Sequence, residues 1–160
     1  MNSAVSEVRE VPGLIIEHGT REWCLLPYPD HPKGCPNFGK SKVCPPFAPH
    51  VESFVDLALP LWFVIEEFDL KSHVARMISK HAGWSDRQAR CVLYWQGSVK
   101  SRLQASADRF CLEHPGTHHT LCPEAMGVNV IATGRSVGLP IQSSPLDTIF
   151  KIALVGYIKE

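Results

Sequence analysis

The sequence predicts an α/β fold: one compact domain with a small central sheet, flanking helices, and a loop rich in proline and cysteine near the N-terminus. Three observations support this class. Apolar runs rich in β-branched and aromatic residues alternate with segments of helical periodicity. The 160 residues are 44% hydrophobic and 20% charged, which is typical of a globular domain with a real core. No internal repeat divides the chain, so we expect a single domain over residues 1–160.

The first half of the chain contains two expected strands and two expected helices. Residues 14–17 form a short apolar run, LIIE, that predicts a strand. Apolar residues spaced i, i+3, i+4 and i+7 predict a short amphipathic helix over 51–58, which Pro60 ends. The run LWFVIEEF, residues 61–68, predicts a buried strand. A further apolar stripe predicts a helix that ends near Gly83.

A capping box opens the second half. Ser85 is the expected N-cap and Gln88 lies three residues on, which predicts the start of a long helix that reaches about Leu112. Gly97 is the candidate break in it, and Gln96 falls on its apolar stripe.

A second loop, a helix and a strand complete the chain. The loop covers residues 114–127 and is rich in histidine. We expect a helix over 127–137 and a terminal strand over 152–158, which also offers an edge for a homodimer.

The charge balance and the pattern of apolar residues limit the cellular locations and the binding partners that we expect. Lysine plus arginine and aspartate plus glutamate both total 16, so the net charge of zero does not indicate nucleic-acid binding. No apolar run reaches the roughly 18 residues that span a bilayer. The N-terminal residues lack the basic flank and apolar core of a signal peptide, so we expect a cytoplasmic protein without membrane attachment. The six cysteines are then ligands, catalytic groups or core residues rather than a disulfide framework.

Three of these cysteines lie in one loop, residues 24–49. Its seven prolines, from Pro27 to Pro49, predict an extended segment without helix. The spacing Cys24-x10-Cys35-x8-Cys44 matches neither a zinc ribbon nor a ferredoxin. Three thiolates do not close a tetrahedral zinc site, but they can hold a 4Fe-4S cluster that leaves one iron open. The alternative is that these cysteines are small buried hydrophobic residues.

Two motifs resemble those of a known family. GCPNFGKSKVCPPFAP, preceded by Cys24, is similar to the signature C…GC-x2-(Y/F)-G-x4-CPP-(Y/F)-x-P of an uncharacterised family of predicted metal-binding proteins of archaea and anaerobic bacteria. CPEAMGVNVIATGRSVGLP resembles the family's segment in which a Met-Glu-rich turn leads to a helix. The resemblance implies metal binding through Cys24, Cys35 and Cys44, leans towards iron, and implies no particular reaction. Many members carry a second cysteine cluster, which this chain lacks, so we expect one site.

The second loop supplies the candidate catalytic residues Cys122, Glu124 and His119. Cys122 or a histidine of this loop completes the metal site or acts beside it as an acid or base, for which histidine suits neutral pH. The alternative is an exposed polar loop with Cys122 in the core. Among the scattered histidines, which we expect at the surface, His50 follows CPPFAP and is the one expected near the metal.

Gln96, Ser98 and Lys100 are the candidate substrate-binding residues. A buried Gln96 amide needs a partner, because an unpaired one costs roughly 1–3 kcal/mol. Lys100, with Arg102 beyond it, suits an anionic group, although a solvated helix face explains both residues equally well.

Two functions from different classes follow. The first is a cytoplasmic iron–sulfur protein whose open iron acts as a Lewis acid on a small-molecule or nucleobase-type substrate, with sulfur removal or transfer as the candidate reaction. The second is a non-catalytic accessory or electron-transfer module, with iron–sulfur or zinc and Cys122 as the fourth ligand. A metal-free interaction domain is the third alternative, and in it the three loop cysteines need not converge in space.

Overall fold

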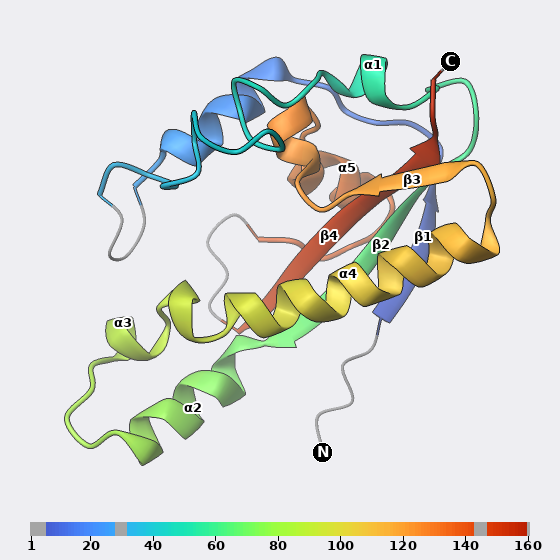
Figure 1. The fold of residues 1–160 in the computed structure, drawn as a ribbon. Helices are drawn as coiled ribbons and strands as arrows, with labels where there is room; N and C mark the ends of the chain where they lie inside the picture. Colours follow the sequence, from blue (N-terminus) through green and yellow to red (C-terminus); the bar gives the residue numbers. More distant parts are fainter. Residues whose placement is uncertain (1–5, 28–31, 143–146, 160) are drawn as a thin grey trace.

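The computed structural model, which describes residues 6–27, 32–142 and 147–159, is built on a four-stranded antiparallel sheet (Figure 1). The strands lie in the order β1 (Ser6–Val11), β2 (Leu61–Asp69), β4 (Thr148–Tyr157) and β3 (Thr117–Thr120). Helices lie on both sides of it, and the predicted α/β class with a small central sheet and flanking helices is confirmed.

The two central strands form the core. β2 and β4 pair from Leu61 opposite Gly156 to Asp69 opposite Thr148. Successive β2 residues point to opposite faces, and both faces are buried, which is why the run reads as continuously apolar rather than alternating.

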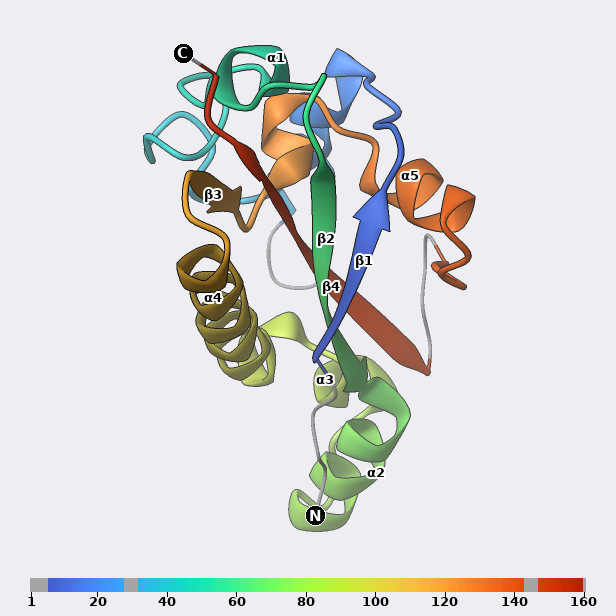
Figure 2. The same cartoon turned by 90° about the vertical axis from the view of Figure 1, so that its right-hand side faces the viewer.

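One face packs against α1 (Val51–Phe54), α5 (Val130–Ser136) and the segments beside them. Phe63 and Leu154 from the sheet meet Met126, Val128 and other apolar residues there, all of them buried. Figure 2 shows α5 on this side of the sheet and α4 (Gln96–Glu113) on the other.

The opposite face packs against α4. Val64 and Val155 of the sheet contact Leu103 and Ala107 of the helix. On the same face the carboxylate of Glu66 is fully buried. It accepts hydrogen bonds from Arg102 Nε at 2.8 Å and Ser6 Oγ at 2.7 Å, so the buried charge is paired.

A smaller core extends beyond the end of β2 (Figure 1). It is made by α2 (Leu70–Lys80), α3 (Asp86–Ala89) and the short 3-10 helix η2 (Val92–Tyr94), with the indole of Trp95 stacked on Phe68 at 5.0 Å. The helices of the described segments include none that combines the length and the apolarity needed to cross a bilayer.

Several expected elements are confirmed and others shift. The strand over 61–68 and the helix before Gly83 are present, and both hydrogen bonds of the Ser85–Gln88 capping box form. The long helix expected after this box is wrong, because extended backbone at Cys91 and an irregular turn at Trp95 divide it into α3, η2 and α4. Gly97 lies inside α4 and breaks nothing.

Other corrections concern segments that pair over long sequence distances. The run at 14–17 forms only an isolated bridge between Ile16 and Val128, and the N-terminal strand is β1. The helix expected over 51–58 ends at Phe54. The helix expected over 127–137 begins at Val130, after the Asn129 N-cap. The terminal strand begins earlier than expected, at Thr148.

Candidate metal centre

Two 3-10 helices position Cys24 and Cys122. Cys24 lies near the end of η1 (His18–Leu25), and Cys122 is the N-cap of η3 (Pro123–Met126). Thr20 Oγ1 donates to the Glu124 carbonyl at 2.8 Å, and Glu17 N donates to the Gly127 carbonyl at 2.8 Å. These bonds hold η1 against η3, so residues about a hundred positions apart become neighbours.

The described part of the cysteine loop, residues 24–27 and 32–49, lies at the end of the sheet that also carries η3 and α1 (Figures 1 and 2). Its described part is a series of hydrogen-bonded turns rather than the extended segment expected from its prolines. Cys35 N donates to the Cys24 carbonyl at 2.6 Å, and Gly39 N donates to the Pro45 carbonyl at 2.8 Å. The Cys44 carbonyl accepts from Ala48 N at 2.9 Å. The loop therefore brings its own thiols back towards η1.

The loop cysteines and Cys122 share one neighbourhood, which we call the thiol cluster: Cys24, Cys35, Cys44 and Cys122. The pKa of Cys24 rises from its ordinary 9.0 to about 11, first because the thiol is partly buried, then because Cys35, Glu124, Cys44 and Cys122 would repel its thiolate. The third sequence alternative, a metal-free interaction domain, does not require such a convergence.

Burial also raises the pKa values of two further acids of this site, Cys122 and Glu124. The pKa of Cys122 is raised by burial first and then by Glu124, while Lys151, Cys44 and Lys100 act more weakly. Burial raises the pKa of the Glu124 carboxyl, and Lys151 opposes that rise. Each acid therefore resists ionisation next to the others, and a bound cation would reverse that preference.

The spacing of the thiols differs from that of a single-ion site. Around one tetrahedral ion with bonds of about 2.3 Å, sulfurs lie only about 3.8 Å apart. In the described segments, only His18, His50 and Glu52 bring three ligand atoms within 4.8 Å of one another. The thiols are thus close enough to interact and too widely spaced to surround one ion as they stand.

Two cavities reach the thiol cluster. One, of about 330 Å³, is mainly apolar and is lined by Cys122, His119, Lys100, Phe54 and Met126 among others. The other, of about 300 Å³, has Cys24, Glu124 and Lys151 in its lining. We call them the Cys122 cavity and the Cys24 cavity. Each places one lysine and one thiol at the same opening.

The expected catalytic residues divide between these cavities. Cys122 and His119 lie in the first, and Glu124 lies in the second. His119 Nε2 pairs with Asp108 Oδ1 at 2.6 Å, which lowers the pKa of that aspartate, and its Nδ1 is buried without a partner in the described part of the chain. The second loop is not irregular throughout, since His118 and His119 belong to strand β3.

The expected substrate residues are only partly brought to the site. Lys100 lines the Cys122 cavity, whereas Gln96 and Ser98 line neither cavity. The expected burial of Gln96 is wrong, because α4 turns Val99 and Leu103 to the core and leaves Gln96 exposed. Arg102 forms an ion pair with Glu66 and is therefore not free to bind an external anion through its Nε.

Several of the remaining cysteines and histidines are buried or packed against other side chains. Cys91 is buried, and Cys111 packs at the α4 face of the sheet. The surface position expected for His73 is wrong, because it is buried and its pKa is lowered by that burial. His81 stacks on Trp84, and His31 lies outside the described residues.

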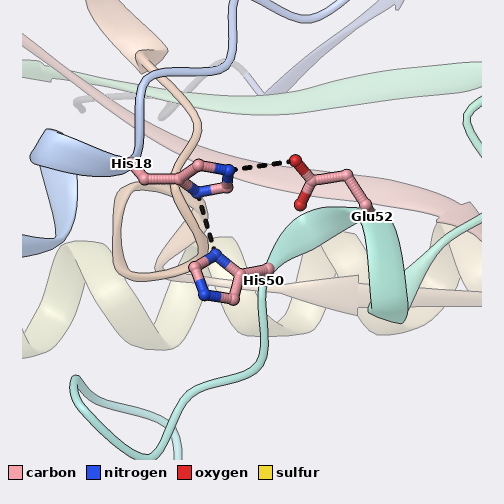
Figure 3. A group of neighbouring side chains, drawn as sticks. All are labelled: His18, His50 and Glu52. Carbon is pink, nitrogen blue, oxygen red and sulfur yellow. Dashed lines mark hydrogen bonds and ion pairs between the residues drawn. The ribbon is translucent and has the colours of Figure 1, made fainter.

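Three relevant side chains were not predicted from the sequence: Lys151, His18 and Glu52. His18 lies six residues before Cys24, and His50, which was singled out, lies six residues after Cys44. This symmetry about the loop is the signal that the sequence offered. Figure 3 shows the two imidazoles and the Glu52 carboxylate pointing toward one another.

Comparison of the chain with protein-family models, with curated proteins and with solved structures found no match. The resemblance to the metal-binding family therefore stays a prediction from the two motifs. Function is inferred below from the thiol cluster and the side chains around it.

Proposed function

We propose that this protein holds a 4Fe-4S cluster through Cys24, Cys35 and Cys44, and that the fourth iron faces a small-molecule substrate. The observation that carries this proposal is the gathering of three loop thiols with Cys122 and Glu124, together with the two cavities that Cys24 and Cys122 line. Five acids in one place favour a bound cation, because burial and mutual repulsion raise the pKa values of Cys24, Cys122 and Glu124 in the metal-free site.

The wide spacing of the thiols supports iron–sulfur over a single zinc ion. A four-iron cluster gives each thiolate its own iron, so the sulfurs lie farther apart than around one ion. Zinc stays the alternative metal, and it would require the loop to close further.

The Cys122 cavity supports an open iron that meets a substrate. Its volume of about 330 Å³ lies at the small end of ligand sites, and its apolar lining includes Lys100 and His119 as polar groups. Lys100 suits an anionic or strongly electronegative group, and the open iron would polarise the substrate as a Lewis acid. A nucleobase-type molecule fits this description, and sulfur removal or transfer is the candidate reaction.

Electron transfer is the second candidate function, and the position of Cys122 favours it. An electron carrier needs no open iron, and Cys122 lies close enough to influence both Cys24 and Cys44 electrostatically. As the fourth ligand it would close the cluster, and the protein would then serve a redox partner rather than a substrate.

Anaerobic purification followed by iron, sulfide and zinc analysis tests the proposal. We expect a brown protein with about four irons per chain, and loss of that iron in Cys24→Ala, Cys35→Ala and Cys44→Ala. Cys111→Ala is the matched control, because this thiol lies outside the thiol cluster, and it should keep its iron. A colourless protein with one zinc, or no metal after reconstitution, would overturn the proposal.

Cys122→Ala separates the two functions. Full iron content in this variant supports the open-iron site, and a spectrum perturbed by small anions would support it further. Loss of the cluster in this variant supports the electron carrier.

A further inference from the structure

A second group of ligand atoms lies at the base of the cysteine loop, outside the thiol cluster (Figure 3). His18 opens η1, His50 is the N-cap of α1, and Glu52 lies in the first turn of α1. His18 Nε2 lies 3.1 Å from Glu52 Oε1, and the Nδ1 atoms of the two imidazoles lie 2.9 Å apart. One ligand atom from each of the three residues falls within a common 4.8 Å.

An unsatisfied oxygen points to a missing partner in this group. Glu52 Oε2 is buried and has no hydrogen-bond partner within the described residues, although the side chain as a whole is partly exposed. A buried carboxylate oxygen without a partner is unfavourable, and a charged one more so. A cation beside Glu52 would satisfy it.

The two imidazoles of this group face one another through their Nδ1 atoms. In the Nδ1 to Nδ1 contact one nitrogen must donate a proton to the other, and protonation of both rings would place two cations side by side. A metal ion would use the nitrogen lone pairs of both rings instead.

The backbone of η3 seats the His18 ring in this position. Gly127 has a positive φ of 96°, and a side-chain carbon added there would lie 2.5 Å from His18 Nδ1. A glycine is therefore needed for the ring to approach, and the ring orientation is fixed by packing rather than by the exposed loop alone.

We propose that His18, His50 and Glu52 bind one divalent transition-metal ion, Zn²⁺ in the first place. Two imidazoles and one carboxylate form the donor set of catalytic zinc sites that keep a coordination position open, and Mg²⁺ or Ca²⁺ would require more oxygen ligands. The site is open to solvent on one side, since 48% of the His18 side-chain surface is exposed. The ion would join the two ends of the cysteine loop.

Co²⁺ and Zn²⁺ titrations of the full-length metal-free protein test this site. Co²⁺ bound by nitrogen and oxygen gives weak visible bands without the intense near-ultraviolet charge transfer that thiolate ligands produce, so the two sites are distinguished in one spectrum. We expect one Zn²⁺ per chain to displace the Co²⁺ that is bound through nitrogen and oxygen ligands.

Matched variants complete the test. His18→Ala and Glu52→Gln should weaken this Co²⁺ binding at least about tenfold, the loss that even an outer-sphere partner of a metal ligand produces. His118→Ala, an exposed histidine of β3, should not. Glu52→Gln keeps the size and helix position of the side chain, so it tests the ligand even where His18→Ala disturbs η1. Unchanged binding in Glu52→Gln, or only thiolate-type Co²⁺ spectra, would overturn this proposal and leave the cysteine-held cluster untouched.

Discussion

At the residue scale, Gly34 controls how closely the cysteine loop approaches η1. Its φ is 85°, and a side-chain carbon added there would overlap the Cys24 carbonyl and lie 2.7 Å from the Leu25 backbone. We expect Gly34→Ala to push Cys35 away from Cys24 and to reduce the iron bound after reconstitution. Iron content and the absorption near the thiolate-to-iron band measure this loss.

Gly39 provides the matched control for that prediction. Its φ is also positive, 75°, but a side-chain carbon there meets nothing within 4 Å. Gly39→Ala thus carries the same backbone strain without the overlap. Equal iron loss in both variants would show that strain, and not the close approach to Cys24, explains the effect.

The Cys24 thiol predicts a pH dependence of the metal-free protein. An acid with a higher pKa in the folded than in the unfolded state binds more protons when folded, so stability falls as the pH rises between those values. For Cys24 the fall is expected between about 9 and about 11. Urea unfolding of the metal-free protein across this range should show it, and Cys24→Ala should weaken the dependence. An identical pH profile for the variant would contradict this origin.

At the scale of elements, the Ser85–Gln88 capping box starts α3. Ser85 Oγ accepts from Gln88 N at 3.2 Å, and Gln88 Oε1 accepts from Ser85 N at 2.8 Å. We expect Ser85→Ala to lower the free energy of unfolding by about 1 kcal/mol, because it removes one half of the box. Ser101→Ala, at an exposed position of α4, is the control, and urea titration measures the free energy of unfolding of both variants. An unchanged midpoint for Ser85→Ala would mean that α3 is held by packing alone.

Elements with strong local signals were predictable, and those defined by distant partners were not. The residues of the capping box and of the apolar run of β2 are enough to predict a helix start and a buried strand. The division between α3 and α4 could not be predicted in this way. It accompanies the stacking of the Trp95 ring on Phe68, which belongs to a strand far away in the sequence. β1 was missed because only its pairing with β2 makes it a strand.

At the scale of the whole molecule, Glu66 ties the sheet to α4 and β1. Its buried carboxylate depends on Arg102 and Ser6, both remote in sequence. We expect Arg102→Ala to lower the free energy of unfolding by about 2–3 kcal/mol, since it leaves a buried charge with one neutral partner. Arg109→Ala, on an exposed position of the same helix, should cost far less. Equal urea midpoints for the two variants would contradict a structural role for this pair.

The α/β class, the central strand and the candidate ligands Cys24, Cys35 and Cys44 could be predicted from the sequence, because apolar runs and cysteine spacing are local properties. The sequence also suggested Cys122 and His50, which the fold brings to the two candidate sites. The contact between η1 and η3, which brings Cys122 and Glu124 near the loop thiols, depends instead on long-range packing. Such packing likewise paired His18 with Glu52, exposed Gln96 and gave Arg102 to Glu66. These outcomes depend on contacts between segments far apart in the chain, and no local periodicity encodes which of them will touch.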